Sequence, residues 1–267
     1  MGGCAMQVYA IPLGQTFEDD GGSGRTGYEA CLVGVQGGVD WWWGQNLVTG
    51  VLVDYGNTDI NYHGLGGDGE MDSIRIGGYA GARGMRRWYV GGLVAYGYHM
   101  IEQTRPVVVG TLARTARGDW DGHDFTAQME TGYDLFDEEQ TFVSITPFAS
   151  LTYNYFYQEE HVEKDSLAMR LDIDDQHTHA MPLLVGLRVA KQFQLYLPMI
   201  AEVSGGWRHD FFADDQDGIE ARFVGAADRF EVARGDAETD SVNLNARLGV
   251  QVTEAIEVNG FYSGDWS

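Results

Sequence analysis

Few residues of this chain combine the types and the spacing that catalysis or cofactor binding requires. Gly64, Gly66 and Gly69 match the G-x-G-x-x-G pattern that brings backbone amides close to a dinucleotide phosphate. That pattern works only between a strand and a helix, and the residues around it predict a loop with no helix after it. We therefore expect no nucleotide site and no cofactor.

Two polar segments carry the carboxylate and imidazole groups that bind metal ions. The segment from Asp215 to Gly218 resembles part of an EF-hand, but Ala213 and Val224 occupy the first and twelfth positions of that loop. The other segment is a predicted solvated loop with five candidate ligands, namely Asp172, Asp174, Asp175, His177 and His179. We predict no metal site in either segment.

A nucleophilic mechanism also lacks a candidate in the sequence. Catalytic triads are recognised by geometry, and no arrangement of Ser, His and Asp can be argued here from spacing. The sequence assigns no catalytic residue, and we predict that the chain is not an enzyme.

Single charged residues interrupt several otherwise apolar segments. An arginine that faces lipid at the membrane midplane costs about 2–4 kcal/mol, whereas one that faces a wet lumen beside a carboxylate costs little. We predict that five such residues line a polar lumen: Arg75, Glu130, Arg188, Glu202 and Arg247.

The segment Thr141–Tyr157 indicates which elements would position those charges. Val143 and Ile145 alternate with Ser144 and Thr146, and this alternation predicts a β-strand with an apolar, lipid-facing side and a polar, lumen-facing side. At roughly 3.3 Å per residue the strand spans about 55 Å, far longer than the usual strand of about 5–6 residues. Similar patterns predict about eleven strands, at Met6–Gly14, Tyr28–Asp40, Asn46–Gly56, Asp72–Arg83, Arg87–Met100, Asp124–Leu135, Thr141–Tyr157, Met181–Val189, Phe193–Phe211, Ser241–Val252 and Ile256–Gly264.

The connections between these strands alternate between two kinds. The short ones fall at Trp43–Gln45, Gly84–Arg86, Asp137–Gln140, Lys191–Gln192 and Thr253–Glu254. The long, acidic ones fall at Thr16–Gly27, Asn57–Met71, Ile101–His123, Gln158–His177 and Phe212–Asp240. Short turns on one rim and long loops on the other are typical of an outer-membrane barrel and not of a Greek-key sandwich. We predict an all-β fold, a transmembrane up-and-down antiparallel β-barrel of about 11–12 strands.

Aromatic residues gather near the ends of the predicted strands. Rings at both membrane interfaces form two girdles in barrels of this kind. The candidates for the girdles are Trp41, Trp43, Trp88, Tyr153, Tyr155 and Trp207.

Composition restricts the function classes. The 267 residues include 40 acidic and 17 basic ones, which gives a formal net charge of −23. A nucleic acid is excluded as a partner because nothing would neutralise its phosphates. No run approaches the 18 or more apolar residues of a membrane-spanning helix, so the chain spans a bilayer as a barrel or not at all.

Several segments, in the same order, resemble the C-terminal β-domain of the autotransporter (type V secretion) family. The most specific are METGYDLF, which begins at Met129, and TPFASLTYNYFYQEE, which begins at Thr146. The others are QVYAIPLGQ, TGYEACLVGVQGGVDWWWGQNLVTGVLVDYG, RRWYVGGLVAYGYH, LLVGLRVAK, GWRHDF and LNARLGVQVTEAIEVNGFYSGDW. The resemblance implies a twelve-stranded barrel in the outer membrane of a Gram-negative-type bacterium.

The resemblance further implies that residues 1–267 form one barrel domain that exports or anchors an N-terminal passenger at the cell surface. Its implied partners are membrane lipid, a passenger polypeptide in the lumen, and the machinery that reads a C-terminal aromatic strand during assembly. The passenger and pore helix would precede Met6, and the closing strand is either missing or supplied by a hairpin of Ile219–Val224 and Arg229–Ala233. Two alternatives are a small porin-like or adhesive outer-membrane barrel and a soluble ligand-binding β-barrel.

Overall fold

A computed structural model of the chain describes residues 4–19, 21, 26–64, 67–84, 87–135, 143–166, 169–213, 218–232, 239–253 and 256–266. These residues form antiparallel strands joined by turns and loops, and none of them belongs to an α-helix. Over the same ranges, no helix is long and apolar enough to cross a bilayer.

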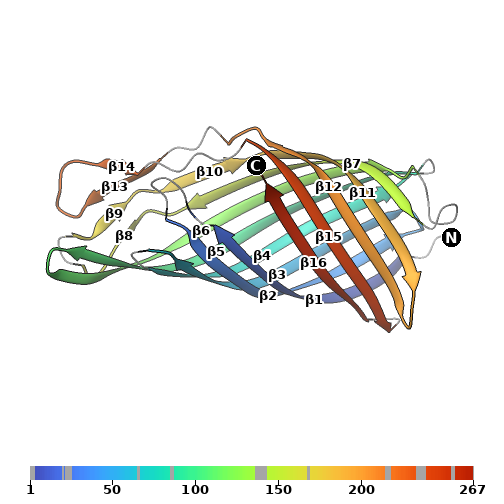
Figure 1. Ribbon diagram of the computed structural model, residues 1–267, viewed down its shortest axis with the longest axis horizontal. Coiled ribbons are helices and arrows are strands. Elements are labelled where there is room, and N and C mark those ends of the chain that lie inside the picture. The colour runs from blue at the N-terminus through green and yellow to red at the C-terminus, as the bar shows by residue number, and fades with distance from the viewer. Residues whose placement is uncertain are drawn as a thin grey trace.

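One large sheet contains most of the chain (Figure 1). Its strands are β1 (Cys4–Asp19), β2 (Tyr28–Trp43), β3 (Leu47–Tyr62), β4 (Asp68–Arg83), β5 (Trp88–Val109), β6 (Leu112–Tyr133), β7 (Ser144–Gln158), β10 (Gln176–Ala180), β11 (Pro182–Gln194), β12 (Pro198–Asp210), β15 (Asp240–Thr253) and β16 (Ile256–Trp266). Strands β10 and β11 pair with β7 in one continuous register and are interrupted only at Met181, so the sheet has eleven crossings. The predicted all-β, up-and-down architecture is confirmed.

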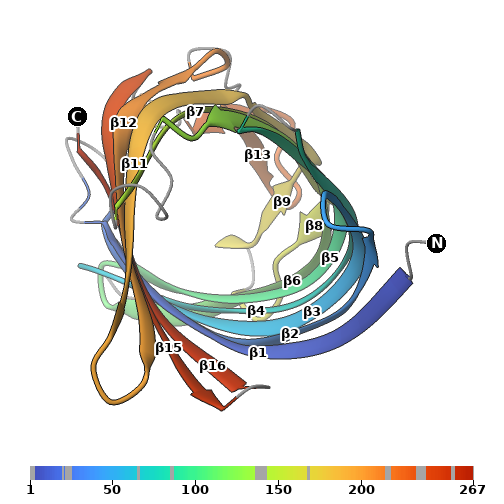
Figure 2. The same cartoon turned by 90° about the vertical axis from the view of Figure 1, so that its right-hand side faces the viewer.

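The sheet curls strongly, so that it has a concave and a convex face (Figure 2). Its convex face exposes large apolar side chains on every second residue, such as Val33, Ile76 and Met129. Its concave face buries polar side chains, such as Thr146 and Ser150 of β7. The alternation in the sequence therefore places apolar residues outside and polar residues inside, because successive strand residues point to opposite faces.

The two rims of the sheet differ as expected. The rim with the short connections, here called the turn rim, includes the turn at Gly44–Asn46 between β2 and β3. The opposite, loop rim carries the longer connections. The predicted turn at Asp137–Gln140 lies outside the described residues.

The prediction of a long loop at Ile101–His123 is wrong. Strands β5 and β6 continue through this region and pair without interruption from Trp88↔Tyr133 to Val109↔Leu112. Both faces of this hairpin mix polar residues with apolar ones such as Val107 and Val108, so it lacks the one-sided pattern by which the other strands were predicted. Strands β1, β3 and β4 also run further toward the loop rim than predicted.

The predicted strand Phe193–Phe211 and the predicted turn at Lys191–Gln192 are wrong as well. The chain turns at Leu195–Leu197, and Gln194 pairs with Pro198 across this turn. Apolar residues keep their period of two through the turn, so the pattern does not mark its position.

A second, four-stranded sheet lies at the loop rim. It contains β8 (His161–Val162), β9 (Leu171–Ile173), β13 (Ile219–Phe223) and β14 (Phe230–Val232). The predicted extra hairpin does form, as β13 and β14, but it joins this small sheet and adds no strand to the large one. Of the two alternatives for the closing strand, the one in which this hairpin supplies it is therefore wrong.

The edges of the large sheet are β1 and β16. Both strands run from the turn rim toward the loop rim, and over the residues described for them no pairing joins one to the other.

Candidate functional site

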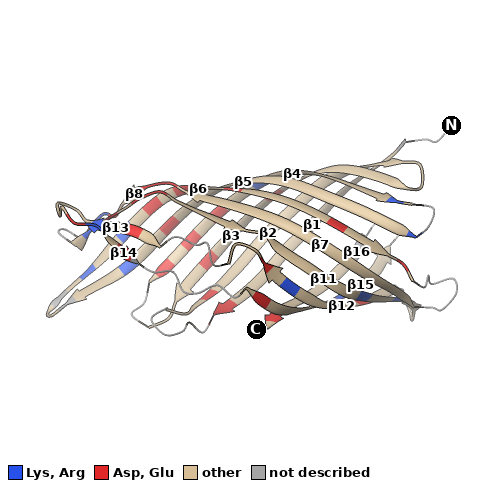
Figure 3. Ribbon diagram, turned by 90° about the horizontal axis from the view of Figure 1, so that it is seen from above, with Lys and Arg blue, Asp and Glu red and all other residues tan. Residues whose placement is uncertain are grey.

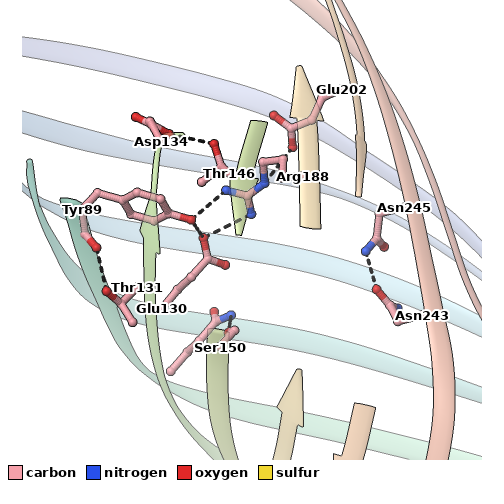
Figure 4. Close-up of polar contacts among 11 residues, drawn as sticks. Tyr89, Glu130, Thr131, Asp134, Thr146, Ser150, Arg188, Glu202, Asn243 and Asn245 are labelled. Atoms are coloured by element: carbon pink, nitrogen blue, oxygen red, sulfur yellow. Dashed lines mark hydrogen bonds and ion pairs between the residues drawn. The ribbon is translucent and has the colours of Figure 1, made fainter. Parts of the chain in front are cut away.

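A polar network on the concave face near the turn rim is here called the turn-side cluster and consists of Tyr89, Glu130, Arg188 and Glu202 (Figure 4). The Tyr89 hydroxyl donates to Glu130 Oε1 at 2.7 Å, and Arg188 donates to the Tyr89 oxygen at 3.0 Å and to Glu130 Oε1 at 3.1 Å. Arg188 Nε also forms an ion pair with Glu202 Oε1 at 3.3 Å, without hydrogen-bond geometry. Arg188 of β11 thus reaches Tyr89 of β5, which is not a neighbouring strand, and only the concave side of a curled sheet permits this contact.

The neighbours of this cluster fix its geometry. The Arg188 guanidinium lies 4.7 Å from the centre of the Phe148 ring, a distance typical of a cation–π contact. Tyr89 lies over Gly132, its direct partner on β6, where a Cβ atom would be 2.5 Å from the Tyr89 ring. Only glycine leaves space for the tyrosine to lie flat on the sheet and to extend its hydroxyl toward Arg188.

A second polar network on the same face, nearer the loop rim, is here called the loop-side cluster and consists of Ser73, Arg75, His99 and Asp124. Arg75 Nη2 donates to Asp124 Oδ1 at 3.2 Å across the intervening strand β5. Asp124 Oδ1 also accepts from His99 Nε2 at 2.6 Å, and His99 Nδ1 lies 2.8 Å from Ser73 Oγ. Asp124 is six residues from Glu130, so the two clusters are about 20 Å apart along β6.

Arg247 is the fifth residue that the sequence assigns to the lumen. It lies on β15 directly opposite Glu202 of β12. Its Nε donates to Asn259 Oδ1 at 2.9 Å, and its guanidinium is 5.9 Å from the Phe261 ring centre. The structure thus gives each of the five predicted charges a polar partner on a nearby strand.

The predicted girdle residues lie toward the two rims of the sheet. At the turn rim, Trp41 and Trp43 end β2, and Trp88 packs against Tyr133 with ring centres 5.2 Å apart. Toward the loop rim, the Tyr153 hydroxyl is 2.9 Å from His179 Nδ1, the Tyr155 ring is 5.0 Å from that imidazole, and Trp207 Nε1 donates to Asp240 at 2.9 Å.

The distance along β5 between two aromatic residues on its convex side, Trp88 and Tyr98, matches the thickness of a membrane. Trp88 and Tyr98, both on the convex side of β5, are about ten residues apart, or about 33 Å along the strand. With the usual tilt of about 40° this separation corresponds to roughly 25 Å, the height of the apolar band of outer-membrane barrels. The convex residues between them include Val90, Val94 and Tyr96, all of which are exposed.

Tyr89, His99 and Asp124 are functional candidates that the sequence did not reveal. In its strand, each of them occupies one of the alternate positions that point to the concave face, so the alternating pattern predicts its face but nothing more. Their partners depend on the register between strands, which the sequence pattern does not specify.

The segment considered for metal binding forms ion pairs instead. Asp172 accepts from Arg222 Nε at 2.7 Å, and Asp174 pairs with Arg229. Within the described part of the chain, no group of three or more Asp, Glu, His or Cys side chains is arranged to hold a metal ion. Asp215 and Asp217 lie outside that part.

The hairpin of β5 and β6 that extends beyond the loop-side rings is braced by the segment around β8. Arg105 forms two hydrogen bonds with the buried Glu163, at 3.0 and 2.7 Å. The His161 ring stacks on Trp120 with centres 4.0 Å apart, and burial lowers the pKa of His161 below its usual value. The exposed Lys164 contacts Asp119 at 2.5 Å, and this hydrogen bond raises the pKa of the lysine.

Charged residues are distributed unevenly between the two ends of the barrel (Figure 3). Charged residues of both signs gather over the end of the molecule that carries β8, β13 and β14. An apolar convex band, aromatic residues at both of its borders and a polar concave face together define an outer-membrane β-barrel.

The comparisons with known proteins identify the family. The autotransporter beta-domain family matches residues 8–263, and the chain belongs to this family. It is 26% identical over 262 residues to an extracellular serine protease of Serratia marcescens, a match that covers 97% of this chain and 24% of that protein. The chain therefore spans about a quarter of that relative.

Two solved structures share the fold. The translocator domain of the autotransporter NalP from Neisseria meningitidis superposes with a TM-score of 0.74 at 16% identity, covering 100% of this chain and 84% of that one. The beta domain of the Bordetella autotransporter BrkA gives a TM-score of 0.60 at 17% identity, with 97% and 91% covered. The chain is thus an outer-membrane barrel with the autotransporter translocator fold, as the sequence predicted.

Proposed function

We propose that this barrel moves an N-terminal passenger polypeptide through its concave interior and anchors it at the cell surface. One observation carries the proposal. The concave face holds charged clusters that connect non-neighbouring strands, whereas the convex face exposes apolar rows. A soluble ligand-binding barrel would bury its apolar face, so this sidedness favours a lipid-embedded wall around a wet interior.

The five predicted charges have a defined role in this proposal. Arg75, Glu130, Arg188, Glu202 and Arg247 line the lumen. Paired with one another and with neighbouring polar groups, they hold its wall in one shape. A passenger passes in an extended, hydrated form and meets charged side chains that are already paired with opposite charges or polar groups, so no strong site holds it back.

The aromatic residues have a second role. We assign Trp41, Trp43 and Trp88 to the interface at the turn rim, and Tyr153, Tyr155 and Trp207 to the interface at the loop rim. Membrane lipid and the outer-membrane assembly machinery are the implied partners of this surface. The protease activity named for the Serratia relative describes a protein about four times longer than the matched region, and it is not assigned to the barrel.

A display experiment tests the proposal. An export signal and an epitope-tagged passenger are fused ahead of Met1, and protease is added to intact cells. We expect the tag to be cleaved from the outside. A Leu187→Arg control, which places a charge on the convex face, should lower both membrane insertion and display. A barrel that inserts normally yet leaves the tag protected in intact cells contradicts the proposal and favours a porin-like or adhesive role.

A further inference from the structure

Three residues of the loop-side cluster form a continuous hydrogen-bonded chain. Ser73, His99 and Asp124 lie on the neighbouring strands β4, β5 and β6. Ser73 pairs directly with His99 across the sheet, and Asp124 pairs with Gly97, two residues from His99 on the same face. The contacts are 2.8 Å from Ser73 Oγ to His99 Nδ1 and 2.6 Å from His99 Nε2 to Asp124 Oδ1.

The direction of each hydrogen bond follows from chemistry. An ionised carboxylate accepts and never donates, so Asp124, paired with Arg75, requires a proton on His99 Nε2. Neutral imidazole carries one N–H, which leaves Nδ1 with a free lone pair. When the ring is neutral, the Ser73 hydroxyl therefore donates to Nδ1. The proton would then move from serine to histidine as in a Ser-His-Asp triad, but with the two ring nitrogens exchanged, because in that triad Nε2 faces the serine and Nδ1 faces the carboxylate.

The surroundings hold this arrangement in place. His99 is 5% exposed and Asp124 is 9% exposed. Gly97 makes the chain possible, because a Cβ atom there would overlap the Asp124 carboxylate. The Phe156 ring packs 5.7 Å from the imidazole and limits its rotation. A base held in one orientation needs no reorganisation before a proton transfer.

Arg75 is the cation beside Ser73 on the concave face, and it lies between the Asp124 and Asp54 carboxylates. Gly56, the partner of Ser73 on β3, places no side chain over the hydroxyl. Arg75 lies two residues along β4 on the same face, and its side chain is 41% exposed. The guanidinium is thus a cationic donor beside the place where a carbonyl oxygen would acquire negative charge.

We propose that Ser73, His99 and Asp124 form an acyl-transfer site on the concave face, with Ser73 as nucleophile, His99 as general base and Asp124 as a positioning residue. The substrate class is a carboxylic ester or a peptide bond lying in the interior. The Ser73 oxygen adds to the carbonyl carbon while its proton moves to His99 Nδ1. The resulting oxyanion collapses and expels an alcohol or amine, which takes that proton. Water then cleaves the acyl-serine ester by the same proton route and regenerates Ser73.

This activity is separate from translocation. A Ser73→Ala barrel keeps its fold and its lumen, so it should still display a passenger. Failure of the acyl-transfer proposal therefore leaves the proposed function untouched, and the display experiment does not test this site.

Covalent labelling of the folded full chain in detergent micelles tests the proposal. A fluorophosphonate probe should label Ser73, identified by mass spectrometry, as an O–P bond forms and fluoride leaves. His99→Gln should lower the labelling rate by about 100-fold or more. The matched control is Ser150→Ala, because the Ser150 hydroxyl also lies on the concave face but is bonded to the Gln128 amide at 3.0 Å. That variant should label at the rate of the unchanged chain.

A second measurement covers the case in which the probe does not reach the site. In Ser73→Cys, iodoacetamide should alkylate the new thiol about 100-fold faster than in the same variant carrying His99→Gln. Asp124→Asn should slow this alkylation, and Asp124→Glu should restore part of it because a carboxylate is retained. Labelling of Ser73 at the rate seen for Ser150, together with alkylation that ignores His99, would overturn the proposal in favour of a purely structural polar row.

Discussion

Replacing Arg188 by methionine tests whether the turn-side cluster stabilises the barrel. The substitution keeps an unbranched side chain over Phe148 but removes two hydrogen bonds and the ion pair with Glu202. It also leaves the Glu130 and Glu202 carboxylates without their shared cation.

The magnitude follows from the contacts and their exposure. A hydrogen bond to a charged group contributes about 1.5–3 kcal/mol, and removing one partner of a fully buried pair costs about 3–5 kcal/mol. Here Arg188, Glu130 and Glu202 are 27%, 24% and 25% exposed, so water compensates part of the loss. After this discount for screening, we expect Arg188→Met to lower the free energy of unfolding by about 1–3 kcal/mol.

Urea unfolding in lipid vesicles gives this free energy by linear extrapolation. The matched control is Arg208→Met on β12. That arginine shares the concave face, but its ion pair with Asp265 is long, at 3.8 Å, and its side chain is 36% exposed. Its loss should cost about 0–1 kcal/mol.

A double-mutant cycle with Glu130→Gln isolates the interaction. The amide removes the unpaired carboxylate, so Arg188→Met should cost less in the Glu130→Gln background, with a coupling energy of about 0.5–3 kcal/mol. If Arg188→Met changes the unfolding free energy by less than about 0.5 kcal/mol and the cycle shows no coupling, the reasoning is refuted, because the cluster then contributes no net stability.

Three further predictions concern the lipid face, the inner packing and the exposed hairpin. Leu187→Arg should destabilise the vesicle-embedded barrel by about 2–4 kcal/mol, and equal stability in vesicles would show that this face does not meet lipid. Gly132→Ala should displace Tyr89 and cost about 1–3 kcal/mol in urea unfolding, a result that an unchanged midpoint would rule out. Because the folded-state pKa of His161 lies below its unfolded value, its contribution is present above about pH 6.5 and is lost as pH falls. Hydrogen exchange around Trp120 and His161 should therefore accelerate in acid, after correction for intrinsic rates, and exchange independent of pH would contradict this assignment.

The sequence predicted the strands that cross the apolar zone because each has one apolar side. Val185, Leu187 and Val189 alternate with Arg188, and the structure exposes the three aliphatic residues on the convex face. The pattern assigns a residue to a face but not to a partner. Arg188 meets Tyr89, which is 99 residues away in the sequence, only through the registers of several consecutive strand pairs.

The same limitation hid the Ser73–His99–Asp124 chain. Ser73 and His99 are separated by 26 positions, and His99 and Asp124 by 25, which are the intervals set by two hairpins and not by a motif. Only the pairing of β4 with β5 and of β5 with β6 brings the three side chains together. The sequence shows that a residue is polar and that it points to the concave face, but it does not show which other polar residue it contacts.

A row of acidic residues marks where the membrane must end. Asp59, Glu70, Glu102 and Asp119 are successive direct partners across β3, β4, β5 and β6. Like charges that face each other across a sheet repel, and in lipid, where neither water nor salt screens them, this arrangement would not persist. The row therefore lies in water, where Lys164 compensates part of it at Asp119. Since Glu102 follows Tyr98 by four residues, the membrane boundary on the side of the loop rim falls between them. Of the 22 residues of β5, only the half nearer the turn rim then crosses lipid, and the other half stands outside as the braced hairpin.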